Sequence, residues 1–320
     1  MKSLLPRRTA RVITAAVIAA ALAACSSAPD PPERVVETQN RAARHVQFGN
    51  EYFREGNYEQ AMYFYRLALA DHRSVDNEAG VAQTLNAVGK VYLETARYEA
   101  AADSFGQGRR IAERVGETET AMQSINNLGE LELRRENAPA AVGHFEEAAA
   151  LSAQLDGEAE RAVILHNLAT AQLRSGSLDA ARENLERARS INAELERWGE
   201  LAANYYMLAS VEARAERLEA ARELLVRALE NDKRMENTGG IAKDLMALGV
   251  VERRLGNYDR AEDYLQRSLQ VHVTRNDARG AMRVLAELEE TARDAGRPGE
   301  ADSYAAERER IETAVAAGDL

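Results

Sequence analysis

Residues 45–68 read HVQFGNEYFREGNYEQAMYFYRLA, two short amphipathic segments joined by a Gly-Asn turn. Apolar and small side chains in each segment lie three and four residues apart, which places them on one face of a helix. The small Gly49 and Ala61 leave room for two helices to approach closely, and the large Phe48 and Tyr65 fill the remaining space. The stretch therefore predicts a pair of packed helices with a tight turn between them.

This pattern returns every 40 residues with no change of register. The small residue of the second helix recurs as Ala61, Ala101, Ala141, Ala181, Ala221, Ala261 and Ala301. The position of Gly49 is occupied by Gly89, Gly129, Ala169, Ala209 and Gly249, and that of Tyr65 by Phe105, Phe145, Leu185, Leu225 and Leu265. Repetition at such a period is typical of a solenoid, in which each helix pair buries its apolar face on its neighbours.

The repeat resembles the tetratricopeptide repeat (TPR) over about residues 42–320. The matching residues are an apolar residue before Gly, a Tyr three residues after that Gly, and Gly-Asn-Tyr at the turn, as in Gly56–Tyr58 and Gly256–Tyr258. The usual unit has about 34 residues, and the longer repeats of kinesin light chain are similar to this one in length and in lacking a closing Pro. The resemblance implies an all-α fold, a right-handed superhelical solenoid of about seven 40-residue TPR-like helix-turn-helix repeats.

The first 24 residues resemble a bacterial export signal. Basic residues precede a run of apolar and small residues from Val12 to Ala24 that only Thr14 interrupts, and this run is short for a bilayer span. It ends in Leu-Ala-Ala-Cys, which resembles the lipobox of bacterial lipoproteins. Cys25, the one Cys of the chain, is therefore predicted to carry the lipid. An ordinary cleaved signal with an incidental Cys and a retained transmembrane anchor are the alternatives.

The sequence predicts four regions. They are a signal peptide (1–24), the lipidated Cys with a Pro-rich flexible tether (25–32), TPR-like repeats one to six (33–281) and a degenerate capping repeat (282–320). In the last repeat Glu289 replaces the small residue of the first helix and Arg308 replaces a small residue of the second, while Ala305 replaces the large one. A polar last repeat suits the solvated end of a solenoid.

Ser26 bears on the predicted location. In enteric lipoproteins an Asp at this position retains the protein in the inner membrane, so Ser26 favours export to the periplasmic face of the outer membrane. The lipid on Cys25 would then hold the protein to the cell envelope.

Composition narrows the classes of function. The net charge is −11, and loss of the four basic residues of the signal segment takes it to −15, which argues against nucleic acid as a partner. A single Cys permits no internal disulfide. The five His residues are dispersed without metal-ligand spacing, and no Gly-rich loop precedes the Lys-Ser/Thr that a phosphate site needs. The sequence therefore predicts no cofactor, no metal and no enzymatic activity.

A set of Asn residues marks the predicted first helices. Asn127 precedes Leu128-Gly129 and Asn167 precedes Leu168-Ala169, and in repeats similar to those of kinesin light chain the Asn at this place holds the backbone of a bound peptide. An amide side chain can pair with both C=O and N–H of an extended chain. The predicted partner-binding groove therefore includes Asn86, Asn126, Asn127, His166 and Asn167. The alternative is that these Asn side chains only bond to neighbouring helices.

Two further features complete the predicted groove. Arg134, Arg174, Arg214 and Arg254 recur at intervals of 40 near the ends of first helices, where guanidinium groups could bind acidic parts of a partner. The alternative is that each Arg interacts favourably with the dipole of its own helix and with nearby Glu residues. Tyr206 lies beside Tyr205 and Met207 and is a candidate apolar anchor.

These observations favour a non-enzymatic scaffold, an envelope-anchored lipoprotein that binds extended segments of other envelope proteins. The alternative function is a solute-binding accessory lipoprotein of a transport system, which would need an enclosed cavity.

Overall fold

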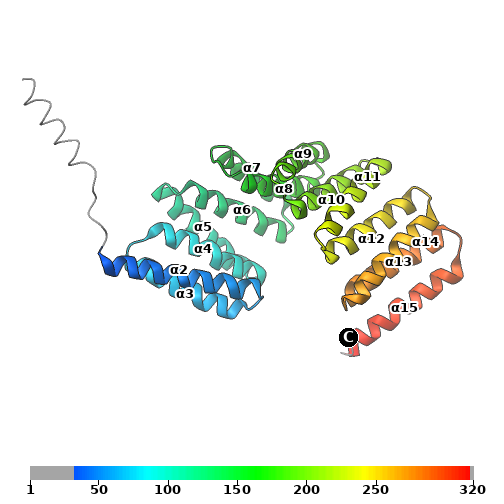
Figure 1. Ribbon diagram of the computed structural model, residues 1–320, viewed down its shortest axis with the longest axis horizontal. Helices are drawn as coiled ribbons and strands as arrows, with labels where there is room; N and C mark the ends of the chain where they lie inside the picture. The colour runs from blue at the N-terminus through cyan, green and yellow to red at the C-terminus, as the bar shows by residue number, and fades with distance from the viewer. Residues whose placement is uncertain (1–31, 318–320) are drawn as a thin grey trace, which may run out of the picture. The chain divides into compact units, whose positions relative to one another are not determined.

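The computed structural model describes residues 32–317, which form fourteen α-helices and no strand (Figure 1). They are α2 (Glu33–Arg54), α3 (Tyr58–Ser74), α4 (Glu78–Glu94), α5 (Tyr98–Val115), α6 (Thr118–Arg134), α7 (Ala138–Ser152), α8 (Glu158–Arg174), α9 (Leu178–Glu194), α10 (Trp198–Arg214), α11 (Leu218–Arg234), α12 (Thr238–Arg254), α13 (Tyr258–Thr274), α14 (Ala278–Asp294) and α15 (Pro298–Ala317). The predicted all-α solenoid of helix-turn-helix repeats is confirmed. The predicted signal segment and Cys25 lie outside the described residues.

The helices form seven consecutive pairs in the described chain, and the even-numbered helices are the first helices of their pairs. Most helices have 17 residues and most turns have three, so two helices and two turns account for the 40-residue period. The six residues by which this unit exceeds the usual TPR therefore lengthen both helices rather than a loop.

Nearly every turn carries one residue with left-handed backbone, and these residues recur at intervals of 20. They are Gly56, Asp76, Ala96, Gly116, Glu136, Gly176, Glu196, Glu216, Glu236, Gly256, Asn276 and Gly296. At the α12–α13 turn, the N–H of Gly256 donates to the carbonyl of Arg253 and the N–H of Asn257 donates to the carbonyl of Glu252. This is the Schellman pattern that ends a helix and reverses the chain. The turn inside a repeat and the turn between repeats thus share one geometry.

The chain divides into two compact units, Met1–Thr84 and Leu85–Leu320. In the first unit, Tyr65 of α3 is almost fully buried and its ring lies directly over Gly49 of α2, where a Cβ would stand 2.6 Å from ring atom Cδ1. Phe48 was expected to fill the space between these helices, but its side chain is 43% exposed and leans on Phe64 at a ring-centroid distance of 5.3 Å. No described helix precedes α2, so no neighbour covers this face.

The second unit repeats the same contact. A Cβ at Gly129 would stand 2.6 Å from Cε1 of Phe145, so only glycine fits opposite the aromatic ring. Where the facing residue is the smaller Leu185 or Leu225, Ala169 or Ala209 stands at the glycine position. The sizes of the two side chains therefore compensate each other in these repeats, whereas Gly249 faces Leu265, whose Cδ2 would lie 2.8 Å from a Cβ at that position.

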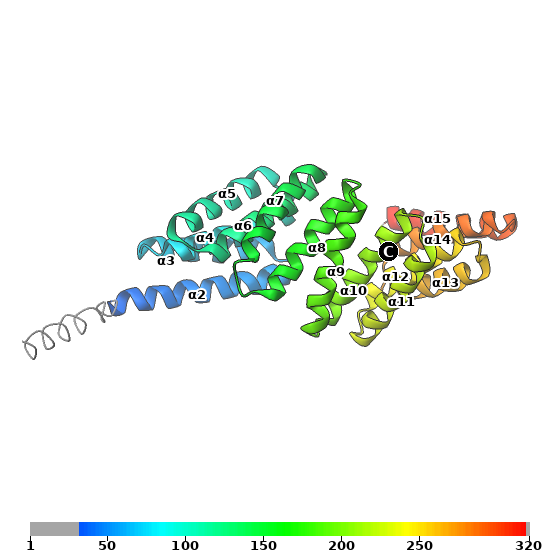
Figure 2. The same cartoon turned by 90° about the horizontal axis from the view of Figure 1, so that it is seen from above.

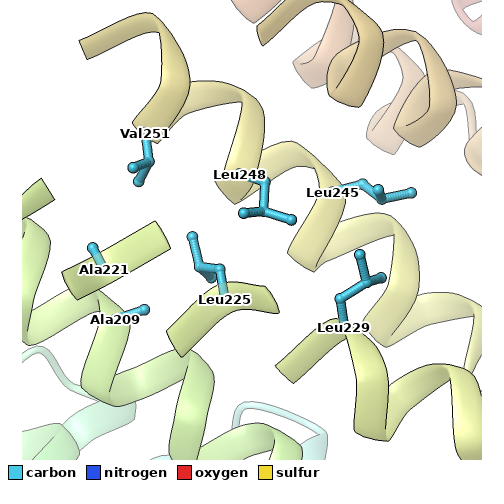
Figure 3. Packing of buried hydrophobic residues seen from close by; sticks show 7 residues of the cluster. All are labelled: Ala209, Ala221, Leu225, Leu229, Leu245, Leu248 and Val251. Atoms are coloured by element: carbon cyan, nitrogen blue, oxygen red, sulfur yellow. The ribbon is translucent and has the colours of Figure 1, made fainter. Parts of the chain in front are cut away.

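Leu and Ala side chains fill the space between helix pairs in the second unit. Figure 3 shows Leu225 and Leu229 of α11 packed against Leu245, Leu248 and Val251 of α12, with Ala209 and Ala221 at the edge of the cluster. Figure 2 shows α12, α13 and α14 side by side, and each of them contacts the next. Each helix pair thus buries its apolar face on the following pair, as a solenoid requires.

The final pair, α14 and α15, replaces the steric contact with an ionic one. Glu289 stands at the glycine position and is 6% exposed, and its carboxylate pairs with Arg293 and with Arg308, whose Nη2 lies 3.1 Å from Oε2. Two of the three residues that break the repeat pattern, Glu289 and Arg308, therefore partner each other. The predicted start of the capping repeat at residue 282 falls within α14, which begins at Ala278.

Candidate ligand-binding groove

The first helices of the second unit carry two hollows on the same side. The first hollow has a volume of about 270 Å³ and lies between α6 and α8, with Lys90 of α4 at one end and Arg197 of the α9–α10 turn at the other. Its polar lining residues are Lys90, Gln123, Asn126, Asn127, Glu160 and Arg197. Both Asn residues predicted on α6 therefore line the same hollow.

Asn127 is the most unusual side chain of the first hollow. It is only 3% exposed, yet its Nδ2 has no hydrogen-bond partner. Asn126 is oriented by Asn167 of α8, whose Nδ2 donates to Asn126 Oδ1 over 3.2 Å. A buried amide donor without a partner costs about 1–3 kcal/mol, so this hollow holds a polar group that a ligand carbonyl could satisfy.

The second hollow lies between α10 and α12 and has a volume of about 260 Å³. His166 of α8 closes one side, and α11 and the following turn close another. Its chemically active lining residues are His166, Tyr206, Asp232, Lys243 and Asp244, and its apolar walls are Ala202, Ala203 and Met207. Of the residues predicted to line the groove, His166 and Tyr206 line this hollow.

The two hollows occupy equivalent places in the repeat, 80 residues apart. Most lining residues of the first have a counterpart in the second: Met122 and Ala202, Gln123 and Ala203, Asn126 and Tyr206, Asn127 and Met207, Ala159 and Gly239, Glu160 and Gly240, Val163 and Lys243, Ile164 and Asp244. Since the backbone repeats, the side chains alone make the first hollow amide-rich and the second acidic and aromatic.

Asp232 and Asp244 form a buried carboxyl pair in the second hollow. Asp244 is 1% exposed, and its Oδ2 has no hydrogen-bond partner. Asp232 receives a bond of 2.9 Å from Asn237 Nδ2 at its Oδ1. Burial, together with the neighbouring charge of Asp232, raises the pKa of Asp244 to about 8. The pair therefore holds a proton at neutral pH.

The other ionisable groups around the pair are held in place. His166 Nδ1 accepts from Asn204 Nδ2 over 3.0 Å, and Asn204 Oδ1 in turn accepts from Asn192. Burial, with the nearby charge of Lys243, lowers the pKa of His166, so the ring is neutral. Lys243 Nζ lies 5.0 Å from the ring centroid of Tyr206, and burial raises the pKa of that phenol.

Asn86 lies apart from both hollows. It is buried on α4, and its Nδ2 donates to the carbonyl of Thr120 while its Oδ1 accepts from Ser124. Both ends of this amide are occupied by the next first helix, α6. A role in partner binding stays a prediction, but the contacts are those of the interhelical alternative.

The predicted Arg residues contact the preceding first helix. Arg174 Nη1 donates to the carbonyl of Leu133 over 3.1 Å, and Arg214 Nη1 donates to that of Leu173 over 2.7 Å. Arg254 reaches the carbonyl of Ala213 in the same way, and Arg134 pairs with Glu94. These carbonyls belong to the last turn of each helix, where backbone acceptors lack helical partners. The Arg series therefore joins repeat to repeat, and its binding of acidic partners stays a prediction.

Asp232, Lys243 and Asp244 were not predicted as site residues. The missed signal is a set of three residues at fixed spacing, the polar Asp232 and Asn237 followed by Gly240. A Cβ at Gly240 would overlap Asp232 Oδ2, and Asn237 bonds both to Asp232 and to the N–H of Gly240. The same arrangement recurs as His72, Asn77 and Gly80 and as His272, Asp277 and Gly280.

Two other kinds of feature, metal-ion sites and membrane-spanning helices, do not occur among residues 32–317. No group of three or more His, Cys, Asp or Glu side chains in this range could hold a metal ion. None of the helices described there has the length and hydrophobicity needed to cross a bilayer.

Comparison with known families supports the repeat assignment. A family model for the tetratricopeptide repeat matches residues 41–114, 120–194 and 160–234, and a second tetratricopeptide repeat model matches 245–275. Among curated protein sequences none matches the chain.

Solved structures with similar folds have low sequence identity to the chain. BtubC from P. vanneervenii is 23% identical, with a TM-score of 0.60 over 70% of this chain and 92% of that one. A Rap protein complexed with Competence and Sporulation Factor is 17% identical, with a TM-score of 0.62 over 86% and 76%. The Rap conjugation gene regulator of plasmid pLS20, in complex with the Phr* peptide, is 19% identical, with a TM-score of 0.59 over 83% and 74%. At these identities the likeness concerns the fold.

Proposed function

Because this chain belongs to the tetratricopeptide repeat family, we propose that it is a non-enzymatic scaffold that binds an extended segment of a partner protein along its first helices. Repeats of this family serve protein–protein interaction, and the side chains between first helices decide what is bound. Two proteins with this fold were solved with a bound factor or peptide. Both hollows are partly open, which suits an extended segment better than an enclosed solute.

The buried Nδ2 of Asn127 carries this proposal. It is an unused donor in a hollow that also has polar lining residues, among them Lys90 and Asn126, beside apolar ones such as Met122 and Ile164. A carbonyl of an extended peptide would accept from it, while Asn126 and Lys90 lie in reach of neighbouring peptide groups. Such hydrogen bonds involve only the backbone of the bound peptide, so the first hollow would bind peptides of many different sequences.

We expect Asn127→Ala to lose binding, because the substitution removes the donor that fixes the peptide register. The measurement is retention of full-length protein on beads that carry random nonapeptides, with affinity for enriched peptides then measured in solution. A loss of about 1–3 kcal/mol, or roughly fivefold to 150-fold in Kd, is expected for one buried hydrogen bond.

Asn231→Ala is the matched control, since Asn231 lies on α11 and bonds only within its own helix, to the carbonyl of Arg227. Binding by this variant should equal that of the unmodified chain. Unchanged affinity in a folded Asn127→Ala protein would refute the groove assignment.

The proposed location is the cell envelope, with Cys25 as the lipid-bearing residue. The support is the sequence pattern of residues 1–25. Partners would then be other envelope proteins presenting peptide-like segments. Growth with an alkyne-tagged fatty acid should label the unmodified chain and leave Cys25→Ser unlabelled; labelling of both would remove Cys25 from the proposal.

A further inference from the structure

We propose that the second hollow binds a primary ammonium group of the captured segment, either a Lys side chain or a free N-terminus. This inference rests on the proposed function, because it assigns the chemistry of one position along the same row of first helices. It concerns Asp232, Lys243 and Asp244, which the peptide-binding role of Asn127 does not involve.

The carboxyl pair needs a donor that the protein does not supply. Asp244 Oδ2 is buried without a hydrogen-bond partner within 3.5 Å, and Asp232 accepts from Asn237 at Oδ1 and otherwise faces the carboxyl group of Asp244. Asp232 Oδ2 lies against Gly240, where the absence of a side chain makes room for it. Two acceptor oxygens therefore meet at the hollow, and either a shared proton or a ligand donor must lie between them.

An ammonium group fits this arrangement better than other cations. It is compact and has three donors, enough for both carboxylates and one further acceptor such as the phenol oxygen of Tyr206. The apolar walls Ala202, Ala203 and Met207 suit the methylene stem of a Lys side chain. A divalent metal lacks a third carboxylate or imidazole ligand here, since no cluster of three is formed in the described chain.

Lys243 does not fill the role itself. Its ammonium group lies over the ring of Tyr206, 5.0 Å from the centroid. Burial raises the pKa of Asp244 and the positive charge of Lys243 lowers it in part, but the ammonium group does not occupy the place of the proposed ligand. The hollow thus presents one net negative pair beside one fixed positive group, and a ligand ammonium entering between the carboxylates would displace the shared proton.

The carboxyl pair joins Asp232 of α11 to Asp244 of α12. The other charged or titratable groups around it lie on four helices: Lys243 on α12, Tyr206 on α10, His166 on α8 and, acting on Tyr206, Arg283 on α14. Burial lowers the pKa of His166 and raises the pKa of Tyr206, so between pH 7 and 8 the imidazole is neutral and the phenol keeps its proton. The proton released on binding therefore comes from the carboxyl pair. Because this proton is lost more easily as the pH rises towards 8, binding should strengthen in that direction.

The test compares three bead-bound nonapeptide libraries on the full chain. One has acetylated N-termini and includes Lys, one has free N-termini and lacks Lys, and one has acetylated N-termini and lacks Lys. We expect at least about tenfold tighter binding to one of the amine-bearing libraries than to the amine-free one. The amine-bearing library that binds more tightly identifies the source of the ammonium group.

Asp244→Asn is the critical variant, since it preserves the shape of the side chain and removes the carboxyl group that would ionise on binding. It should bind all three libraries within about twofold of one another while retaining the affinity of the amine-free library. Equal binding of the three libraries by the unmodified chain would overturn the ammonium assignment and leave the peptide-binding function standing. No binding of any library would overturn both.

Calorimetry in two buffers of different ionisation enthalpy gives an independent readout. Because the pKa of Asp244 is about 8, most of the protein carries the shared proton at pH 7. Binding of an amine-bearing peptide should release close to one proton from the unmodified chain and none from Asp244→Asn. Absence of proton release with tight amine binding would show that the pair is not the site.

Discussion

At the scale of single residues, the fold depends on size compensation between two columns of side chains. Gly129 faces Phe145, whereas Ala169 faces Leu185 at the next repeat. The aromatic ring occupies the volume that a methyl group would need, since protein interiors leave almost no free space. A larger side chain at the position of Gly129 therefore needs a smaller one at the position of Phe145.

We expect Gly129→Ala to destabilise the protein by about 1–3 kcal/mol, because the new methyl group would overlap the Phe145 ring. Adding Phe145→Leu should restore much of the loss, since the double variant recreates the Ala-Leu pair of the following repeat. Urea denaturation followed by circular dichroism measures both. A double variant less stable than Gly129→Ala alone would contradict the compensation.

Asp244 makes the stability of the folded chain depend on pH. Its pKa is about 8 when folded and about 3.9 when unfolded, so between these values the folded state binds more protons. Stability from this group is therefore present at low pH and is lost as the pH rises from about 4 to about 8. We expect Asp244→Asn to gain stability relative to the unmodified chain between pH 5 and pH 8, measured by urea midpoints. A pH-independent difference would contradict the raised pKa.

At the scale of helices, one turn geometry connects all but one pair of neighbours. The exception is α7–α8, where residues 153–157 form a longer connection without a left-handed residue. Elsewhere Gly, Glu, Asp, Asn or Ala adopts a positive φ, although a side chain makes that conformation costly. The Schellman bonds and the packing of both flanking helices impose the geometry, and the sequence does not always supply glycine for it.

The same substitution should have opposite effects in a turn and in a helix. Gly256→Ala should cost about 1–2 kcal/mol, because φ there is 78° and no neighbouring atom would clash. Gly143→Ala should stabilise the protein by about 1 kcal/mol, because Gly143 lies exposed inside α7 with open space around it. Shifts of equal sign in the urea midpoint would contradict this account.

At the scale of the whole chain, two structural devices repeat while the binding chemistry does not. The steric pair between the two helices of a repeat recurs at 40-residue intervals up to α12–α13, and the Arg bonds to the preceding repeat recur at the same interval. The two hollows use the same backbone places with different side chains. Such a scaffold can change its ligand preference at one repeat without altering the packing of the others.

The sequence by itself determined the helix pairs, their 40-residue period and the family. These follow from local spacing, since residues three, four and 40 apart have fixed relations once the chain is helical. It also placed Asn126 and Asn127 together, because consecutive residues lie close to each other without any tertiary information.

Only the tertiary structure decided what surrounds each polar residue. Asn86 and Arg214 are bonded to a neighbouring first helix, while the Nδ2 donor of Asn127 is left without an acceptor. Asp232 and Asp244 come from different helices and meet because Gly240 lets them approach. Burial and pairing depend on contacts between helices, and that is the physical reason why composition and spacing could not show them.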